Sequence, residues 1–396
     1  MKKWKIIGKS KTGNILDLLL QNRGIKTKKE IEEFLHPKLE SVTTKTVGVD
    51  QKQLKIAVKR IQKAIEDKEQ IVVFGDYDVD GICGAAILWE TLYALGASVI
   101  PYIPHRVDEG YGLSKTGISN IQSQMSNVKL IITVDNGIVA NDAVEFAKRE
   151  GIDVIITDHH VPGKKLPKAH AIVHTTKLCG TAVAYLLAQE FKILEDHLGL
   201  VALATVADLV PLTGANRTLL TYGLNILQKT KRTGIMAICS EAGIDQRTIG
   251  TYEIGHVIAP RLNAMGRLEY AMDSLRLLCT KDQQRAKLLA EKLGSTNRER
   301  QELTLETVLH ATSGIRNQES GIRKKLLFIS HESYQQGVIG LVAGKLVEEF
   351  YRPAIVVSKG EKVSKASARS VHGFNIIEFI RLASEHLVDV GGHPMA

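Results

Sequence analysis

The sequence predicts an α/β protein in which helices cover both faces of a parallel sheet, followed by a second, smaller α/β domain. Between residues 71 and 156, short apolar segments alternate with segments of helical length, which is typical of a parallel sheet. A second series of apolar segments follows a long charged stretch near 281–312. At 396 residues the chain exceeds the size at which single cores usually stop growing, so at least two domains are expected.

The first half of the chain has recognisable helix and strand signals. Residues 1–48 are expected to form a small helical segment, in which Thr27 and Glu30 have the spacing of a capping box. A helix from Leu54 to about Glu66 then precedes the first strand. Strands are expected near 71–75, 98–103, 130–134 and 153–156. Helices are expected near 82–95, 115–126 and 139–150.

The second half becomes helical from Gly180, including a small-residue helix that ends at Asp208. Charged residues from Lys281 to about Thr312, without Pro and with one Gly, predict a long helix between two lobes. Strands are then expected near 325–329, 354–357 and 363–368, with helices near 337–350 and 374–386. The expected domains are therefore 1–48, 49–280, the linker helix 281–312, and 313–396.

Charge is distributed unevenly along the chain. Residues 1–60 contain 15 Lys or Arg against 6 Asp or Glu, so this segment alone accounts for the net charge of +9. Such a basic region attracts polyanions, although a solvated lysine-rich surface explains the charge equally well. The four cysteines show no paired spacing, and no segment has the length of a membrane span. We therefore expect a soluble cytoplasmic protein with free thiols.

The most informative segment is Gly75-Asp76-Tyr77-Asp78-Val79-Asp80-Gly81, directly after an apolar run. If the strand continued through it, its period of two would point all three carboxylates to one side. Acids crowded in this way repel one another, and divalent cations neutralise them. The alternative interpretation is an ordinary acidic turn at a strand end.

Three later segments also end in an acid or a histidine. Asp135 follows the run 130–134, Asp158-His159-His160 follows 153–157, and Asp208 follows 201–207. In an open α/β sheet, ligands bind beyond the carboxyl ends of the strands, so these side chains are expected to converge. Alone, each segment is also compatible with a turn or a solvated loop.

These segments resemble the DHH phosphoesterase superfamily and, within it, the RecJ family of single-strand-specific 5′ exonucleases. The resemblance extends from Arg23 to the last residue. It rests on the following motifs: Gly-Asp-Tyr-Asp-Val-Asp-Gly at 75–81, Val-Asp-Asn-Gly at 134–137, Thr-Asp-His-His at 157–160, Ala-Asp-Leu-Val-Pro-Leu at 207–212, the segment 259–267, Ser-Ala-Arg-Ser at 367–370, and Gly-Gly-His-Pro at 391–394.

The resemblance implies a DHH catalytic domain at 49–280, joined by the linker helix to a DHH-associated, substrate-binding domain at 313–396. It also implies two Mn²⁺ or Mg²⁺ ions in one active site. Asp135 would bridge both ions and act in catalysis, His160 would contact the scissile phosphate, and Asp158 would orient a histidine. The implied metal ligands are Asp76, Asp78, Asp80, Asp135, His159 and Asp208.

The same resemblance implies a set of substrate contacts. Arg106, Ser367 and Arg369 would bind the 5′-phosphate, since guanidinium groups suit a terminal phosphate. The backbone near the metals would be held by Arg261, Asn263 and Arg267, and a nucleotide would be contacted by Gly392 and His393. For each arginine the alternative is an interdomain salt bridge.

Two departures from the family pattern accompany the resemblance. Ala368 stands where family members commonly have Gly, and the chain stops inside the Gly-Gly-His-Pro motif. Family members usually carry a further OB-fold that grips single strands. The chain is therefore expected to be either a fragment or a core with weakened processivity.

The implied function is metal-dependent 5′-to-3′ hydrolysis of single-stranded DNA to 5′-mononucleotides in DNA repair and recombination. The implied partners are single-stranded DNA, a single-strand-binding protein and a helicase, and the implied state is a monomer. One alternative is a DHH phosphodiesterase acting on short oligoribonucleotides, cyclic dinucleotides or pyrophosphate. The other is an inactive single-strand-binding relative, which predicts the loss of metal ligands.

Overall fold

The computed structural model describes residues 8, 14–106, 108–192, 194–317, 325–388, 390–392 and 394–396. The chain divides into two compact units. The larger comprises Met1–Ala259 and Met272–Lys287, and the smaller comprises Pro260–Ala271 and Leu288–Ala396. The four segments expected from the sequence remain a prediction. Among the described residues, no helix combines the length and the apolar character needed to span a bilayer.

Within its described residues, the larger unit contains a five-stranded sheet of order β2-β1-β3-β4-β5, in which every pairing is parallel. The strands are β1 (Gln70–Gly75), β2 (Val99–Tyr102), β3 (Val128–Val134), β4 (Asp153–Asp158) and β5 (Ala171–His174). The α/β class and the first four strands were predicted. The edge strand β5 was not predicted.

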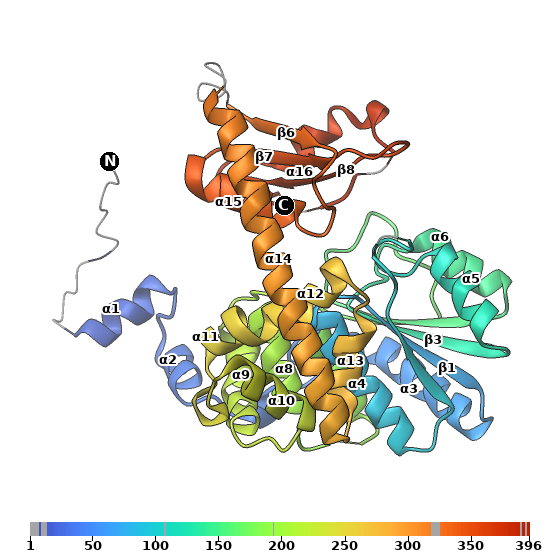
Figure 1. Ribbon diagram of the computed structural model, residues 1–396. Helices are drawn as coiled ribbons and strands as arrows, with labels where there is room; N and C mark the ends of the chain where they lie inside the picture. The colour runs from blue at the N-terminus through green and yellow to red at the C-terminus, as the bar shows by residue number, and fades with distance from the viewer. Residues whose placement is uncertain are drawn as a thin grey trace. The chain divides into compact units, whose positions relative to one another are not determined.

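Helices cover both faces of this sheet. On one face, apolar side chains of β1, β3 and β4 form a buried core with α5 (Lys115–Gln124) and α6 (Asn141–Arg149). On the other face lie α4 (Val79–Ala94) and α7 (Gly180–Gln189), and α3 (Gln51–Glu66) packs against β5. Figure 1 shows α5 and α6 beside the sheet, with α4 on the opposite side. The sheet is therefore buried on both faces, as its nearly uninterrupted apolar strands require.

Further helices complete the larger unit. α1 and α2 precede α3, and α2 begins with the predicted capping box, in which Thr27 and Glu30 bond each other's backbone N–H groups. The remaining bounds are α1 (Ile15–Asn22), α2 (Lys28–Leu35), α8 (His197–Ala207), α9 (Gly214–Leu227), α10 (Thr233–Ala242), α11 (Thr251–Glu253) and α13 (Met272–Cys279), with short 3₁₀ turns at Leu39–Ser41 and Gln246–Thr248 and a π-helical turn at Ile254–Ile258.

The smaller unit is also α/β. Its described three-stranded sheet has the order β6-β7-β8, with β6 and β7 parallel and β8 antiparallel to β7. Its core is formed mainly by side chains of α14, α15 and the first two strands. Its elements are α12 (Ala259–Leu268), α14 (Gln283–Asn317), β6 (Leu327–His331), α15 (Ile339–Phe350), β7 (Ala354–Ser358), β8 (Lys365–Arg369) and α16 (Ile376–Arg381). The first residue of α12 and the first five of α14 belong to the larger unit.

The long helix and the second α/β domain are confirmed. One helix prediction was wrong in extent: the helix expected at 374–386 ends at Arg381, and a separate 3₁₀ turn follows at Ser384–His386. Leu382 is 84% exposed, so the residues beyond Arg381 lack the buried apolar face that would stabilise a continuing helix.

Candidate metal centre and substrate contacts

The first acidic motif connects β1 to α4. β1 ends at Gly75, Asp78 is the N-cap of α4, and Asp80 lies in the first helical turn. The expectation that all three carboxylates alternate along one strand was therefore wrong. Asp78 instead accepts hydrogen bonds from the backbone N–H groups of Asp80 and Gly81, at 3.0 and 3.2 Å. Unpaired N–H groups at a helix start favour a carboxylate there, which starts the helix earlier than expected.

Glycine allows this turn to close tightly. A Cβ atom at Gly81 would lie 2.4 Å from the backbone nitrogen of Asp76, so any side chain at position 81 would push the acidic loop away from the helix. Because Gly81 has no side chain, the backbone of Asp76 can pack directly against the first turn of α4.

Asp80 is held by the N-terminus of a second helix. The backbone N–H groups of Gly180 and Thr181, at the start of α7, each donate to an oxygen of Asp80 at 2.7 Å. Gly180 also brings α7 close to Asp135, since a Cβ there would lie 2.6 Å from Asp135 Oδ1. Both residues belong to a segment that carried no sequence signal for the site, because backbone donors can be supplied by any residue type.

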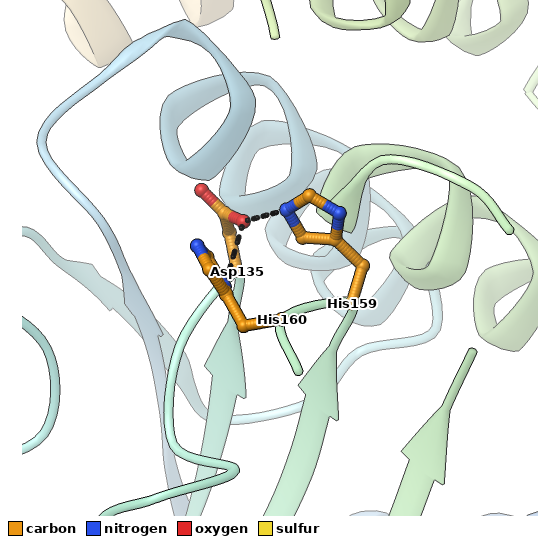
Figure 2. Close-up of side chains that lie close together, drawn as sticks. All are labelled: Asp135, His159 and His160. Carbon is orange, nitrogen blue, oxygen red and sulfur yellow. Dashed lines mark ion pairs between the residues drawn. The ribbon is translucent and has the colours of Figure 1, made fainter. Parts of the chain in front are cut away.

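Asp135 follows β3 in a left-handed backbone conformation, with φ of 63°. Such a conformation is rare for a residue with a side chain and is concentrated at functional sites. Asp135 Oδ1 lies 3.1 Å from His159 Nε2 and 3.9 Å from His160 Nδ1. Figure 2 marks both ion pairs with dashed lines. The ends of β3 and β4 thus bring one carboxylate and two imidazoles together.

Asp158 differs from the other acids, because both of its carboxylate oxygens accept hydrogen bonds from neighbouring groups of the chain. Its Oδ1 accepts from the backbone of His159 and from the backbone and Nδ1 of His160, at 2.7 to 3.1 Å. Its Oδ2 accepts from the backbone of Ile138 at 2.9 Å. Although burial opposes it, the hydrogen bond to His160 lowers the pKa of Asp158 and raises the pKa of His160. The structure therefore pairs Asp158 with the ring of His160.

We define the Asp–His cluster as the six residues that the sequence analysis assigned to metal binding, namely Asp76, Asp78, Asp80, Asp135, His159 and Asp208. Their side-chain atoms form overlapping groups, such as Asp80 with His159 and Asp208, in which the ligand atoms all lie within 4.8 Å of one another. The structure thus brings together residues from four distant segments, at the carboxyl edge of the sheet and the end of α8.

The Asp–His cluster carries more negative charge than its surroundings balance. Burial and the charge of Asp78 raise the pKa of Asp76, and burial and the charges of Asp80 and Asp78 raise the pKa of Asp208 to about 8. One oxygen of Asp76 and one of Asp135 are buried and accept no hydrogen bond from the described residues. Buried acceptors normally have partners. Carboxylate oxygens with one imidazole fit Mn²⁺ or Mg²⁺, which would supply the missing positive charge.

The sequence analysis missed Tyr111, which lies beside this centre. Its hydroxyl is 3.3 Å from the carbonyl oxygen of Asp135 and 3.2 Å from His160 Nε2. Although Tyr111 is 52% exposed as a residue, desolvation of its hydroxyl and the neighbouring carboxylates raise the pKa of Tyr111, so the hydroxyl stays protonated. Tyr111 also contacts the edge of Tyr77, whose ring lies under Arg106 at 4.8 Å. One indirect signal for Tyr111 was present in the sequence: its partner Tyr77 stands between two predicted metal ligands, Asp76 and Asp78.

Asn136 was also missed as a positioning residue. Its side chain is buried, donates to the carbonyl oxygens of Val134 and Phe74, and accepts from the backbone of Leu113. It therefore joins the ends of β1 and β3 to the loop after β2. An Asn in the motif Val-Asp-Asn-Gly looks like an ordinary turn residue, so its role depended on the fold.

The predicted substrate-binding residues are divided between the two units. Arg106 belongs to the larger unit, with the Asp–His cluster. The others that the structure describes belong to the smaller unit: Arg261, Asn263, Arg267, Ser367, Arg369 and Gly392. His393, the remaining predicted contact, lies outside the described residues.

Within the smaller unit, Ser367 and Arg369 lie on β8 next to the start of α15. Arg369 Nη1 donates to the carbonyl oxygen of Ala368 at 2.7 Å and lies 3.4 Å from Ser367 Oγ. A Cβ at Gly340 would lie 3.0 Å from Ser367 Oγ. Elsewhere, Arg267 donates to the carbonyl oxygen of Gly337 at 3.3 Å. The Ser367–Arg369 pair is thus a preformed polar surface on one strand.

Comparison with known proteins agrees with this geometry. The DHH family, N-terminal domain, matches residues 70–205, and the DHHA1 domain matches residues 323–396. The single-stranded-DNA-specific exonuclease RecJ of Bacillus subtilis is 38% identical over 391 residues, covering 96% of this chain and 49% of that protein. The Escherichia coli protein of the same name is 32% identical over 418 residues, covering 96% of this chain and 71% of that protein.

Solved structures give the same result. RecJ from Thermus thermophilus in complex with Mn²⁺ matches with a TM-score of 0.80 at 30% identity, covering 96% of this chain and 55% of that one. An exonuclease RecJ bound to manganese matches with a TM-score of 0.75 at 32% identity, covering 87% and 88%. This chain spans about half the length of the Bacillus subtilis relative. The similarity nevertheless covers nearly all of the present sequence, and the chain belongs to the RecJ family.

Proposed function

We propose that this chain is the catalytic part of a metal-dependent exonuclease that hydrolyses single-stranded DNA from its 5′ end to 5′-mononucleotides, in DNA repair and recombination. The observation that carries the proposal is the Asp–His cluster, whose buried carboxylates need divalent cations. The RecJ relatives, named as single-stranded-DNA-specific exonucleases, support the substrate and the reaction.

The six residues of the Asp–His cluster would hold the metal ions. When bound, Mn²⁺ or Mg²⁺ would activate a water molecule and neutralise charge on the phosphoryl oxygens. The chain itself holds the carboxylates in place: the α4 N-terminus binds Asp78, and the α7 N-terminus binds Asp80. These fixed donors preorganise the site before substrate arrives.

His160 is the residue we propose to contact the scissile phosphate. Its Nδ1 is engaged by Asp158 and its Nε2 lies next to the hydroxyl of Tyr111. Because the pairing with Asp158 raises the pKa of His160, the protonated imidazole is favoured, and it would stabilise negative charge that develops on the phosphate. Asp158 therefore acts as a positioning residue in this proposal.

For the smaller unit, we propose that Ser367 and Arg369 bind phosphate oxygens of the substrate. The hydrogen bond from Arg369 to Ala368 holds the guanidinium against its strand, so its orientation is fixed in advance. Arg106, Arg261, Asn263, Arg267, Gly392 and His393 stay predictions as further contacts, as do a single-strand-binding protein and a helicase as partners, a monomeric state and a cytoplasmic location.

The test is hydrolysis of a 3′-labelled single strand and of the matching duplex by the purified chain with Mn²⁺. We expect stepwise shortening of the single strand alone, and protection when a bulky group blocks its 5′ end. Asp78→Ala should be inactive, whereas Asp142→Asn, which changes an exposed acid on α6, should be fully active. Equal digestion of the duplex, or activity in Asp78→Ala, would contradict the proposal.

A further inference from the structure

A second buried polar cluster lies in the larger unit, outside the proposed active site. The carboxylate of Glu90 on α4 accepts hydrogen bonds from both terminal nitrogens of the Arg232 guanidinium, at 2.7 and 2.8 Å. His197, the first residue of α8, lies 2.9 Å from the same carboxylate through its Nε2. Arg232 also pairs with Asp196 at 2.8 Å and donates to the carbonyl oxygen of Leu278 at 2.8 Å. We call these four charged or ionisable residues, Glu90, Asp196, His197 and Arg232, the Glu90–Arg232 cluster.

This cluster is built into the core. The side chains of His197, Arg232 and Glu90 are 1%, 7% and 17% exposed, whereas that of Asp196, at the edge of the cluster, is 39% exposed. Its carboxylates and imidazole lie close enough together to hold a metal ion, but the Arg232 guanidinium already occupies that position and satisfies both acids. Arg232 therefore takes the place that a cation would have, and a second metal site is not the explanation.

The position of the cluster along two helices is informative. α4 carries Asp80 in its first turn and Glu90 ten residues later, about 15 Å along the axis. α8 starts at His197 and ends next to Asp208, eleven residues later, at about 16 Å. The two helices pack against each other. Both are therefore joined by the Glu90–Arg232 cluster at one end and carry proposed metal ligands at the other.

Apolar packing gives helices α4 and α8 no directional bond to each other. Almost every residue of α8 is buried, as are most residues of α4, so neither helix has a polar face that sets its rotation. A slip of one residue moves a helix by about 1.5 Å, whereas metal–ligand distances hold within about 0.2 Å. In some proteins, a directional buried polar pair fixes the register of packed helices.

We infer that Glu90, Arg232 and His197 are positioning residues for the metal centre, which set the separation of Asp80 and Asp208 through helices α4 and α8. This inference rests on the proposed function, because it takes Asp80 and Asp208 as metal ligands. It assigns a remote role to residues that do not touch metal or substrate.

The test compares two Glu→Gln variants of the full chain. Glu90→Gln weakens the cluster. Glu69→Gln is the matched control, because Glu69 pairs with a buried arginine, Arg60, at 2.6 Å and is 20% exposed. Arg60 also bonds Asp153 at the start of β4, at the opposite end of that strand from Asp158. Both variants lose a buried ion pair, but only Glu90→Gln acts on α4 and α8.

Calorimetric titration with Mn²⁺ is the primary measurement. Changing residues that orient metal ligands typically costs ten- to a hundredfold in affinity, and we expect about tenfold weaker binding in Glu90→Gln and no change in Glu69→Gln. On single-stranded DNA, the Mn²⁺ concentration for half-maximal activity should rise to the same extent. Excess Mn²⁺ should restore the rate, and KM for DNA should stay unchanged.

Equal Mn²⁺ affinity in Glu90→Gln, Glu69→Gln and the wild type would overturn the inference and leave the proposed function intact. A wild-type chain that binds no Mn²⁺ would overturn both, and one that binds Mn²⁺ without hydrolysing DNA would overturn the proposed function alone. If Glu90→Gln does not fold, the double variant Glu90→Met with Arg232→Met replaces the pair by apolar side chains of similar volume. Wild-type Mn²⁺ affinity in that variant would also overturn the inference.

Discussion

The two ends of helices α4 and α8 carry buried polar clusters that balance charge in opposite ways. At one end, the Glu90–Arg232 cluster pairs each acid with a cation of the chain, and the hydrogen bonds from Arg232 and His197 lower the pKa of Glu90 to about 2 although burial opposes this. At the other end, two buried carboxylate oxygens of the Asp–His cluster accept no hydrogen bond from the described residues, and burial and the charge of Asp78 raise the pKa of Asp76.

The difference separates a structural cluster from a functional one. Both contain buried acids at comparable distances from their neighbours, so burial and acidity alone do not distinguish them. What distinguishes them is whether the chain supplies the compensating charge. Where it does, the acids contribute to stability. Where it does not, the buried acids lower the stability of the metal-free protein but leave a site that can bind a cation, as at many functional sites.

Among changes that test this difference between the two clusters, Asp135→Asn is expected to have the largest effect. Losing a proposed metal ligand should lower the rate of single-strand hydrolysis by about a thousandfold, or about 4 kcal/mol. At the same time, the metal-free protein should become more stable by about 1 kcal/mol, because one buried charge is removed from a repulsive group. Chemical denaturation in a chelator checks the second part. A metal-free Asp135→Asn that unfolds more easily than the wild type would break the comparison.

Glu90→Ala should have the opposite effect on stability. It leaves Arg232 buried without its main partner, which typically costs about 3 kcal/mol or more. Urea denaturation in a chelator measures this loss directly. The matched control is Asp142→Asn on the exposed surface of α6, for which we expect a change within about 0.5 kcal/mol. A stable Glu90→Ala would mean that the Glu90–Arg232 cluster does not support the fold.

Mn²⁺ should stabilise the chain only through the Asp–His cluster. At a free concentration one hundred times its dissociation constant, a ligand that binds only the folded state adds about 2.7 kcal/mol. Thermal unfolding with and without Mn²⁺ should show this increase in the wild type, and the increase should be absent from Asp135→Asn at the same concentration. Equal stabilisation of both proteins would place the ion elsewhere.

The smallest expected effect concerns pH. The folded pKa of Glu90, about 2, lies below the ordinary value of 4.5, so its contribution to stability is present above pH 4.5 and is lost as the pH falls towards 2. Between pH 5 and 4 the loss should be less than about 1 kcal/mol. The difference in unfolding free energy between the wild type and Glu90→Gln should shrink over this range. A difference independent of pH would contradict the pairing with Arg232.

Local patterns in the sequence were enough to predict the α/β class, most strands, the long helix and the segments that carry the proposed ligands. Apolar runs of strand length and acids that follow them are local features, and parallel topology brings their carboxyl ends to one edge. That is why Asp135 and His159, on different strand ends, could be grouped before the fold was known, whereas Asp208 follows a helix. The direction of the acids at 76–80 was mispredicted, since capping of α4 overrode the strand period.

Tertiary structure alone decided which groups stand around those ligands. Gly180 and Thr181 bind Asp80 through backbone N–H groups, which any sequence provides, and Tyr111 approaches His160 from a loop with no pattern of its own. The Glu90–Arg232 cluster gave no signal either, because its residues are spread from position 90 to 232. Long-range pairing depends on how helices pack, and short sequence periods carry no information about it.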